Sequence, residues 1–222
     1  MIGFGSRPMW TSLTAKKFAW LLGNLSFHIA GYLGINSYLS RQGASYDLAI
    51  ALDHQIPFIK YFAPFYSIVY LIPVVTFFLC WNNYPLIKAA AKAFIGAGVI
   101  CFTCFLLFPV KYELRVDLQP PYDFFTHILR FFYWIDEPYN CFPSLHVALA
   151  MISAAIVRWQ RPRLAPVFYL LAAIVSASIL FMKQHYVLDL AGGLGVSWLM
   201  TALFLAREPQ EETEVIEPAA PA

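Results

Sequence analysis

The sequence predicts an all-α membrane protein of six transmembrane helices, with interfacial helical segments on its outer face. Of its 222 residues, 60% are hydrophobic and only 13% are charged, and the mean hydropathy is +0.61. Soluble domains carry about 45–50% apolar and about 25% charged residues, so this composition excludes that class. It also excludes intrinsic disorder, which requires low hydrophobicity, and four cysteines are too few for a disulfide-stapled module.

Six apolar runs are candidates for membrane spans, because about 20 helical residues cross a bilayer. They lie at about 18–40, 62–82, 87–109, 144–160, 164–182 and 186–206. The runs are continuous, whereas the strands of a membrane barrel alternate between apolar and polar residues. The first run follows Lys16 and Lys17, as in a signal peptide. It is too long and lacks a small-residue cleavage site, so we predict a retained span.

Two stretches between the spans are too long for simple turns. Residues 41–61 form one, and residues 110–143 form the other, which contains an aromatic segment from Phe124 to Trp134. An interfacial helix with an aromatic belt at the level of the lipid headgroups accounts for the aromatic segment. A lid or entrance for a lipid headgroup is the alternative, and one segment can serve both purposes.

The distribution of basic residues predicts that both termini are cytoplasmic. With the N-terminus inside, the inner segments hold nine bases and the outer segments hold six, in agreement with the positive-inside rule. We therefore expect a multi-pass protein of the cell (inner) membrane whose outer face meets the periplasm or exterior. The membrane domain is predicted to comprise residues 1–207. Residues 208–222 are rich in Glu, Pro and Ala and are predicted to be a disordered acidic tail.

Polar residues gather at the outer ends of the fourth and sixth spans, at the same membrane face. Pro143 and Ser144, shortly after Cys141, are helix-start signals and mark the beginning of the fourth span. Capping alone explains Ser144, but a helix N-terminus also presents free N–H groups that suit a phosphate. His146 would then face whatever that terminus binds. The fourth span is short, so we expect its outer end to lie below the membrane surface, in a pocket.

The sixth span begins with a second cluster, from Lys183 to Asp189. His185 and Asp189 are four residues apart and therefore share one face of a helix. The carboxylate can accept a hydrogen bond from one imidazole nitrogen and leave the other as an unprotonated nucleophile. A buried pair that joins two helices is the alternative. Because ionisable groups in spans are costly and often functional, two such clusters at one face favour catalysis.

Together these residues resemble two signatures of the type-2 phosphatidic acid phosphatase (PAP2) superfamily of membrane lipid phosphatases. The Pro-Ser-x-His pattern at 143–146 resembles the second signature, and the His-x3-Asp pattern at 185–189 resembles the third. The surrounding strings at 140–147 and 183–189 resemble the branch that includes inositol-phosphorylceramide synthase-like transferases. Six spans with the site at the outer face also match the fold of that superfamily.

The resemblance implies a two-step mechanism and a role for each motif residue. His185 would attack phosphorus and become a phosphohistidine, while Asp189 holds its ring. His146 would protonate the leaving alkoxide and then activate water or an acceptor alcohol, and Ser144 with adjacent N–H groups would hold phosphate oxygens. No metal or other cofactor is required, and no spacing of His, Cys and Asp indicates a zinc or magnesium site. Phosphoryl transfer needs mainly positioning and cationic stabilisation, which agrees with this set of residues.

The sequence departs from the family pattern at the cations. The third signature usually starts Ser-Arg, but Ser178 and Ile179 stand at those positions, so the usual phosphate-clamping Arg is missing. Lys183 can place a cation in the same pocket, without the bidentate fork of Arg. The first signature, Lys-x6-Arg-Pro, is represented only by Lys111 and Arg115, at a shorter spacing. We expect all three cations to bind phosphate; for Arg115, snorkelling at the interface is nearly as well supported.

Several other motifs have structural explanations. Cys101 and Cys104 form a CxxC inside an apolar span and are predicted to be packing residues. The small residues at 191–195 are predicted to let helices approach closely, not to bind a nucleotide. His28 is expected to be a hydrogen-bonded packing residue, and His127 is expected to lie at the interface.

We therefore expect a membrane enzyme that hydrolyses a lipid phosphate or diphosphate ester through a phosphohistidine at the non-cytoplasmic face. Its partners would be the lipid substrate and the bilayer, and the net charge of only +2 indicates no nucleic acid. The first alternative is a lipid phosphotransferase that passes a phosphoryl headgroup to an alcohol, as inositol-phosphorylceramide or sphingomyelin synthases do. The second is a non-enzymatic transporter whose His and Asp groups line a polar path, although no internal repeat supports it.

Overall fold

The computed structural model describes residues 9–43 and 45–205 of the chain. These residues form a helical bundle that contains no β-strand, which confirms the all-helical class. The elements in chain order are α1 (Met9–Gln42), α2 (Ala51–Gln55), η1 (Lys60–Phe62), α3 (Ala63–Tyr66), α4 (Ile68–Leu79), α5 (Tyr84–Leu107), α6 (Phe124–Ile135), α7 (Leu145–Gln160), η2 (Pro162–Leu164), α8 (Ala165–Phe181) and α9 (Val187–Phe204). Arg207 and the predicted tail at 208–222 lie outside the described residues.

Five segments of the described chain are long and apolar enough to cross a membrane. They are Ser12–Gln42, Lys60–Leu79, Tyr84–Leu107, Pro162–Phe181 and Val187–Phe204. The other predicted span is the apolar helix α7, which has 16 residues. Its rise is roughly 24 Å, less than the roughly 30 Å of a hydrocarbon core. Length and composition therefore support five spans, and the total of six stays a prediction.

The second predicted span, 62–82, is not one continuous helix. It comprises the end of η1, then α3 and α4, which meet at Ser67. Pro64 stands in the first turn of α3, where its missing N–H removes no helical hydrogen bond. The Ser67 hydroxyl donates to the Pro64 carbonyl oxygen at 2.6 Å. The break leaves Tyr66 at the end of α3, where its side chain is fully buried.

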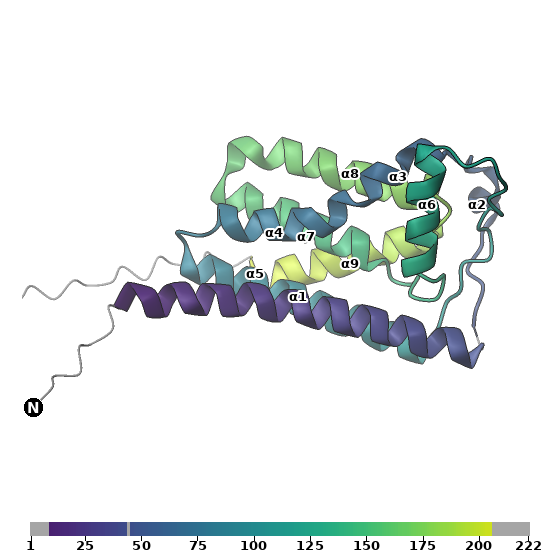
Figure 1. Ribbon diagram of the computed structural model, residues 1–222. Coiled ribbons are helices and arrows are strands. Elements are labelled where there is room, and N and C mark those ends of the chain that lie inside the picture. Colours follow the sequence, from purple (N-terminus) through teal and green to yellow (C-terminus); the bar gives the residue numbers. More distant parts are fainter. Residues whose placement is uncertain (1–8, 44, 206–222) are drawn as a thin grey trace, which may run out of the picture.

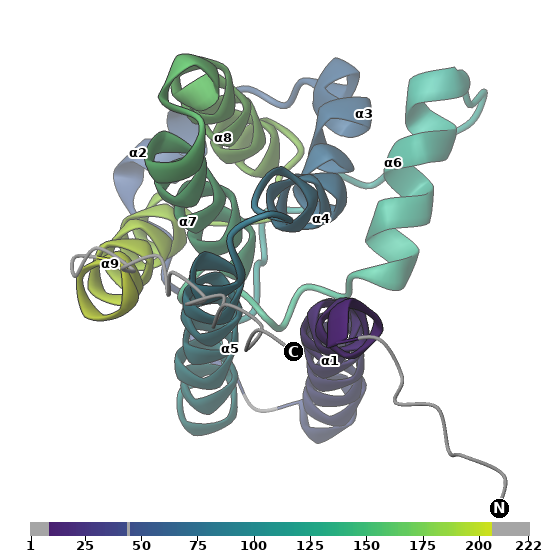
Figure 2. The same cartoon turned by 90° about the vertical axis from the view of Figure 1, so that its left-hand side faces the viewer.

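Helix α7 lies at the centre of the bundle. It packs against α8, α9, α4 and α5, whereas α1 packs against α5. Figure 1 shows α1 running along one side of the molecule, and the end-on view of Figure 2 shows α7 between the other helices. The fully buried Ala148, Ala150 and Ala154 let the neighbouring helices approach α7 closely, as small residues do between helices in a bilayer.

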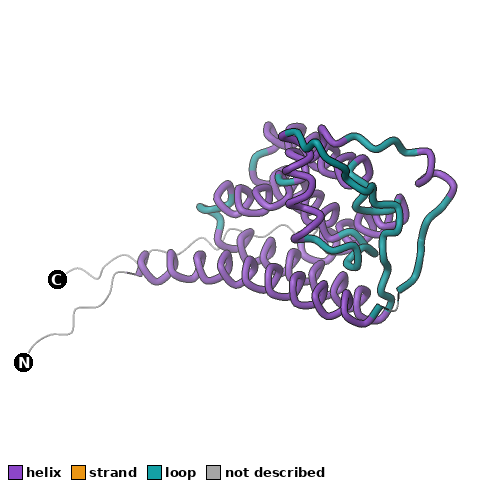
Figure 3. The backbone as a smooth tube through the Cα atoms, turned by 45° about the vertical axis from the view of Figure 1, so that its right-hand side comes forward, coloured by secondary structure: helices purple, strands orange, loops and turns teal. Residues whose placement is uncertain are grey.

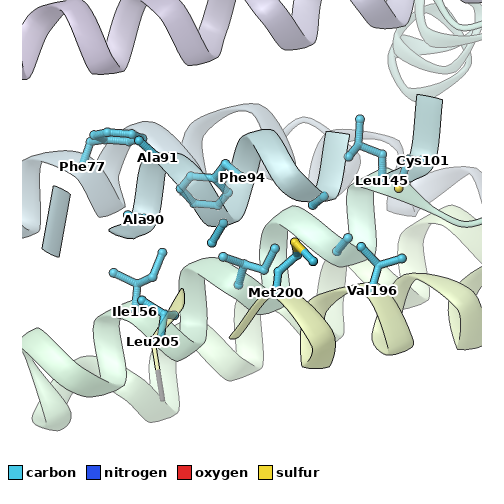
Figure 4. Close-up of a cluster of buried hydrophobic side chains, with 14 of the residues drawn as sticks. Phe77, Ala90, Ala91, Phe94, Cys101, Leu145, Ile156, Val196, Met200 and Leu205 are labelled. Carbon is cyan, nitrogen blue, oxygen red and sulfur yellow. The ribbon is translucent and has the colours of Figure 1, made fainter. Parts of the chain in front are cut away.

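The largest group of buried side chains joins α5, α7 and α9. Figure 4 shows Phe94, Ile156 and Met200, one from each of these helices, gathered in this cluster. Cys101 of α5 is fully buried there, as expected of a packing residue. The cluster therefore joins α7, which carries His146, to α9, which begins two residues after His185.

Small residues at the start of α9 allow it to lie against the N-terminal end of α7, which bears out their predicted packing role. A Cβ added at Gly193 would lie 2.5 Å from the Ser144 carbonyl oxygen. A Cβ added at Gly192 would lie 2.8 Å from the Pro143 side chain. Real Cβ atoms essentially never approach so closely, so both positions require glycine at this backbone spacing. At Gly195, by contrast, nothing lies within 4 Å.

The long connections gather at one end of the bundle, together with α6. Figure 3 shows these loops, and Figure 1 shows α6 lying across that end. Asp123 caps α6 by accepting a hydrogen bond from the Thr126 N–H at 2.9 Å. Large apolar side chains project from α6, with Phe124 69% and Trp134 75% exposed. This pattern suits the interfacial helix expected in 110–143, which stays a prediction.

Candidate active site

Two helix N-termini carry the predicted catalytic residues. Ser144 is the N-cap of α7, and His146 follows in the first turn. Asp189 stands in the first turn of α9, where its Oδ2 accepts a hydrogen bond from the Tyr186 N–H at 2.8 Å. The Ser144 N–H donates to the Asp189 carbonyl oxygen at 3.0 Å, so the two helix ends are joined directly.

The three predicted catalytic side chains form one line of hydrogen bonds. Asp189 Oδ2 lies 3.2 Å from His185 Nδ1. His185 Nε2 lies 3.3 Å from His146 Nδ1. All three side chains are at least 95% buried. The carboxylate thus orients the His185 ring and leaves its Nε2 facing His146, which is the arrangement expected of a nucleophile beside an acid.

The line continues beyond His146 into residues that the sequence did not identify. His146 Nε2 lies 2.8 Å from the Tyr66 hydroxyl, which donates in turn to Asp136 Oδ2. The other oxygen of Asp136 accepts a hydrogen bond from the Tyr32 hydroxyl at 2.6 Å. Tyr66 and Asp136 are both buried. Tyr66 lies in α3, Asp136 follows α6, and Tyr32 lies in α1. No motif in the sequence therefore links these three residues to His146.

Ser144 is the N-cap of α7, and its predicted role in binding phosphate oxygens stays a prediction. Its Oγ accepts a hydrogen bond from the Val147 N–H at 3.5 Å, and its side chain is fully buried. The first-turn N–H groups of α7 at Leu145 and His146 have no intrahelical acceptor. Backbone donors therefore lie beside the two histidines, as a phosphate site at a helix N-terminus requires.

Arg115 is a predicted phosphate-binding cation that contacts the loop carrying His185. One guanidinium nitrogen donates to Gln184 Oε1 and to the Asp136 carbonyl oxygen, the latter at 2.5 Å. The guanidinium also lies 4.5 Å from the centre of the Tyr133 ring. Its Nε is buried and has no hydrogen-bond partner among the described residues. Since Gln184 directly precedes His185, this arginine is held next to the catalytic line.

The two lysines are placed differently. The Lys183 ammonium donates to the carbonyl oxygens of Asp53 at 3.0 Å and Ile56 at 2.7 Å. Burial lowers the pKa of Lys183, and the nearby Asp53 carboxylate opposes that shift. Lys111 pairs with Glu113 at 2.8 Å on the partly exposed surface. Phosphate binding by either lysine stays a prediction, because both ammonium groups have other partners in this structure.

Cys141, His185 and Asp189 place three potential metal-binding atoms within 4.8 Å of one another. Burial raises the pKa of the Cys141 thiol well above its ordinary value, so the thiol remains protonated. Its Sγ donates to the Pro138 carbonyl oxygen at 3.3 Å. His185 and Asp189 are also joined by the hydrogen bond that orients the His185 ring, and the absence of a metal at this cluster stays a prediction.

An apolar groove of about 400 Å³ ends at the catalytic line. It lies between α1 and α4, with Tyr32, Asp136 and His146 at one end and Leu21 and Phe77 among its remaining lining residues. Ile29, Leu33 and Tyr70 also line it, and their side chains are between 41% and 57% exposed, so the groove opens on the side of the bundle.

The groove also contains His28, which behaves as the predicted packing residue. Its two ring nitrogens bond to the Asn24 carbonyl oxygen at 2.9 Å and the Phe94 carbonyl oxygen at 3.2 Å. His127 is exposed on α6, with its ring 5.8 Å from that of Tyr122, which suits the predicted interfacial position.

A bundle of apolar helices with a buried pair of histidines at one end is typical of a multi-pass membrane protein with a polar site. The chain belongs to the PAP2 superfamily, whose family model matches residues 43–203, more than two thirds of its length. This membership supports a membrane enzyme of the phosphatase or phosphotransferase type. No curated protein and no solved structure gives a significant match to the chain. The narrower resemblance to the inositol-phosphorylceramide synthase branch stays a prediction.

Proposed function

We propose that the protein hydrolyses a lipid phosphate or diphosphate ester through a phosphohistidine on His185. The observation that carries this proposal is the buried line from Asp189 through His185 to His146, with separations of 3.2 and 3.3 Å. One carboxylate fixes the nucleophile, and the facing imidazole can protonate the leaving oxygen. A phosphate that binds between the two rings replaces the hydrogen bond between them.

The phosphate oxygens are proposed to bind to the N-terminus of α7 and to Arg115. The helix offers the N–H groups of Leu145 and His146 and the positive end of its dipole. Arg115 offers a planar cation with an unpaired Nε, held beside Gln184. Developing negative charge on the equatorial oxygens is what such donors stabilise in phosphoryl transfer. Arg115 thereby compensates for the arginine missing from the third signature.

The apolar groove supports a lipid as the substrate. From Leu21 to Tyr32 the helix α1 rises by roughly 16 Å, which is close to half of a roughly 30 Å hydrocarbon core. A lipid whose phosphate lies at His146 can therefore extend one chain along the groove within a single leaflet. An extended chain advances roughly 1.25 Å per carbon at ordinary bond lengths, so the groove accommodates roughly 13 carbons.

The site is proposed to face the periplasm or exterior. The described inner segments under this orientation include the basic loop at 158–163, and the catalytic line lies at the opposite ends of α7 and α9. The positive-inside rule favours this placement. Accessibility of a single cysteine introduced beside Trp134, measured with an impermeant maleimide on intact cells, tests it: labelling supports an outer site, and protection opposes it.

The test of the function is a panel of lipid phosphates given to the purified protein in detergent, with and without an alcohol acceptor. Wild type should release inorganic phosphate, and His185→Ala should release none. Transfer of a labelled phosphoryl headgroup to the alcohol, with no release of inorganic phosphate, would establish the phosphotransferase instead. Equal activity of wild type and His185→Ala would exclude His185 as the nucleophile of either reaction.

A further inference from the structure

We propose that Asp136, acting through Tyr66, is a positioning pair that keeps His146 doubly protonated, with Nδ1–H directed at the leaving oxygen. This inference rests on the proposed function. Its basis is a count of the hydrogen atoms available in the buried line from Tyr32 to Asp189, in which every group is in hydrogen-bond contact with the next.

The count begins at Asp136. An ionised carboxylate only accepts hydrogen bonds, and it accepts one from Tyr32 and one from Tyr66. A tyrosine hydroxyl has a single hydrogen, which Tyr66 gives to Asp136. The Tyr66 oxygen can then only accept from its other neighbour, His146 Nε2, at 2.8 Å. His146 therefore carries a hydrogen on Nε2.

The same reasoning applies at the other end. Asp189 accepts from His185 Nδ1, so the hydrogen of His185 is on Nδ1 and its Nε2 has a free lone pair. His185 Nε2 and His146 Nδ1 are 3.3 Å apart, and a hydrogen bond between two nitrogens needs one hydrogen. That hydrogen belongs to His146 when His185 is the nucleophile. The two rings together hold three hydrogens and one positive charge.

Burial and the facing His185 disfavour a positive charge on His146, and the Asp136 carboxylate is the group that opposes them. The groups that face it are charged or aromatic: Tyr32 from α1, Tyr66 from α3, Tyr70 from α4, Asp136 after α6 and His185 before α9. The ring centres of Tyr32 and Tyr66 lie 5.8 and 4.9 Å from that of the imidazole. Of the oxygens of Asp136, Arg115 donates to the backbone carbonyl, whereas the carboxylate accepts from the two tyrosines.

The arrangement gives a balanced reaction. His185 Nε2 attacks phosphorus, the N–P bond forms, and the ester P–O bond breaks. The leaving oxygen takes the electron pair of that bond and the hydrogen from His146 Nδ1. His146, now neutral and still bound to Tyr66 through Nε2–H, then removes a proton from water. The water oxygen attacks phosphorus, the N–P bond breaks, and its electron pair returns to His185 Nε2.

Two substrates distinguish positioning from a merely structural role. Dodecyl phosphate has an alkoxide leaving group that must be protonated, whereas 4-nitrophenyl phosphate has one that leaves without a proton at neutral pH. For both Asp136→Asn and Tyr66→Phe, we expect the first-turnover rate with dodecyl phosphate to fall about 100-fold, because general acid catalysis is lost. With 4-nitrophenyl phosphate, which does not need the acid, the rate should fall by no more than about three-fold. Retained activity on the second substrate also reports that the variant is folded.

The pH profile provides an independent readout. In Asp136→Asn the charge that holds the proton on His146 is gone, so the alkaline limb of kcat/KM for dodecyl phosphate should move to lower pH by about one unit. Asp117→Asn and Tyr122→Phe remove a carboxylate and a tyrosine hydroxyl outside the line, and both should behave as wild type. Equal losses with the two substrates, or an unmoved alkaline limb, would overturn the positioning role. A wild type that hydrolyses neither substrate would refute the proposed function instead.

Discussion

Replacing Gly193 by alanine should separate the two helix ends that form the active site. The added Cβ would meet the Ser144 carbonyl oxygen at 2.5 Å and the Val147 Cβ at 2.9 Å. Ordinary contact begins at 3.4 Å, so the N-terminus of α7 has to move away from α9 by up to about 0.9 Å. The obstacle is backbone, which cannot rotate aside as a flexible side chain can.

This displacement acts on the reacting atoms, because His146 belongs to α7 while His185 and Asp189 belong to the start of α9. A misplacement near 1 Å in an active site lowers the rate about 100-fold, and we expect a loss of that size in kcat. The thermal unfolding midpoint should also fall, since overpacking of a buried position destabilises by about 1–3 kcal/mol. Phosphate release from a lipid phosphate in detergent and a thermal unfolding scan measure the two effects.

Gly195→Ala is the matched control, two residues further along the same helix. Nothing lies within 4 Å of its added Cβ, so activity should equal that of wild type and the unfolding midpoint should not fall. If Gly193→Ala and Gly195→Ala were equally active and equally stable, the close approach of α9 to Ser144 would not govern the site, and the reasoning would be refuted.

Three further perturbations test other parts of the site and fold. Val74→Trp fills the groove and should lower kcat/KM for a long-chain lipid phosphate at least about ten-fold while sparing butyl phosphate, whereas the exposed neighbour Val75→Trp should change neither. Arg115→Ala should lower kcat/KM about 100-fold by removing a phosphate donor, and Arg130→Ala, on the exposed face of α6, should not. The hydrogen bond from Lys60 holds the pKa of Asp123 well below its usual value of 3.8. The pair therefore stabilises the fold above pH 3.8, and this stabilisation is lost as the pH falls further. In Lys60→Met the unfolding midpoint should fall less steeply below that pH.

Each of these has a clear contrary result. Equal losses on long and short phosphates in Val74→Trp would show a general defect and not a blocked groove. Wild-type kinetics in Arg115→Ala would leave Lys111 or Lys183 as the phosphate cation. An unchanged acid dependence in Lys60→Met would show that the exposed pair contributes nothing measurable, as many surface ion pairs do.

Much of the helical arrangement follows from apolar runs alone. The predicted run at 87–109 corresponds to α5, Tyr84–Leu107, and the run at 186–206 corresponds to α9, Val187–Phe204. The run at 62–82 corresponds to the candidate span Lys60–Leu79, but uniform hydropathy conceals the break at Ser67 between α3 and α4. Hydropathy measures how apolar a stretch is, and it does not report local hydrogen bonding such as that between Ser67 and Pro64.

The candidate site was predictable only where its residues share a helix end. His185 and Asp189 are one helical turn apart, so their contact follows from spacing. The contact of His146 with His185 followed from placing both spans at one membrane face. Asp136 and Tyr66 lie 70 residues apart in sequence and meet only through packing, so no local pattern could reveal them.

The contacts of the basic side chains could not be predicted from sequence spacing either. Sequence reasoning favoured Lys183 because it stands two residues before His185, but the chain turns there with a positive φ of 57° and directs the ammonium to the carbonyl oxygens of Asp53 and Ile56. Arg115 is far from His185 in sequence and reaches it through Gln184. Position along the chain therefore does not by itself determine which groups a charged side chain contacts.

The most direct measurement is the trapping of the covalent intermediate. Wild type turning over a lipid phosphate labelled with ³²P should be quenched in alkali, in which phosphohistidine is stable, and the labelled peptide identified. Because Asp189 holds Nδ1, the label should lie on Nε2 of His185. His185→Ala should carry none. Label at another residue, or an active wild type that never becomes labelled while single-turnover release proceeds, would contradict a phosphohistidine mechanism at this site.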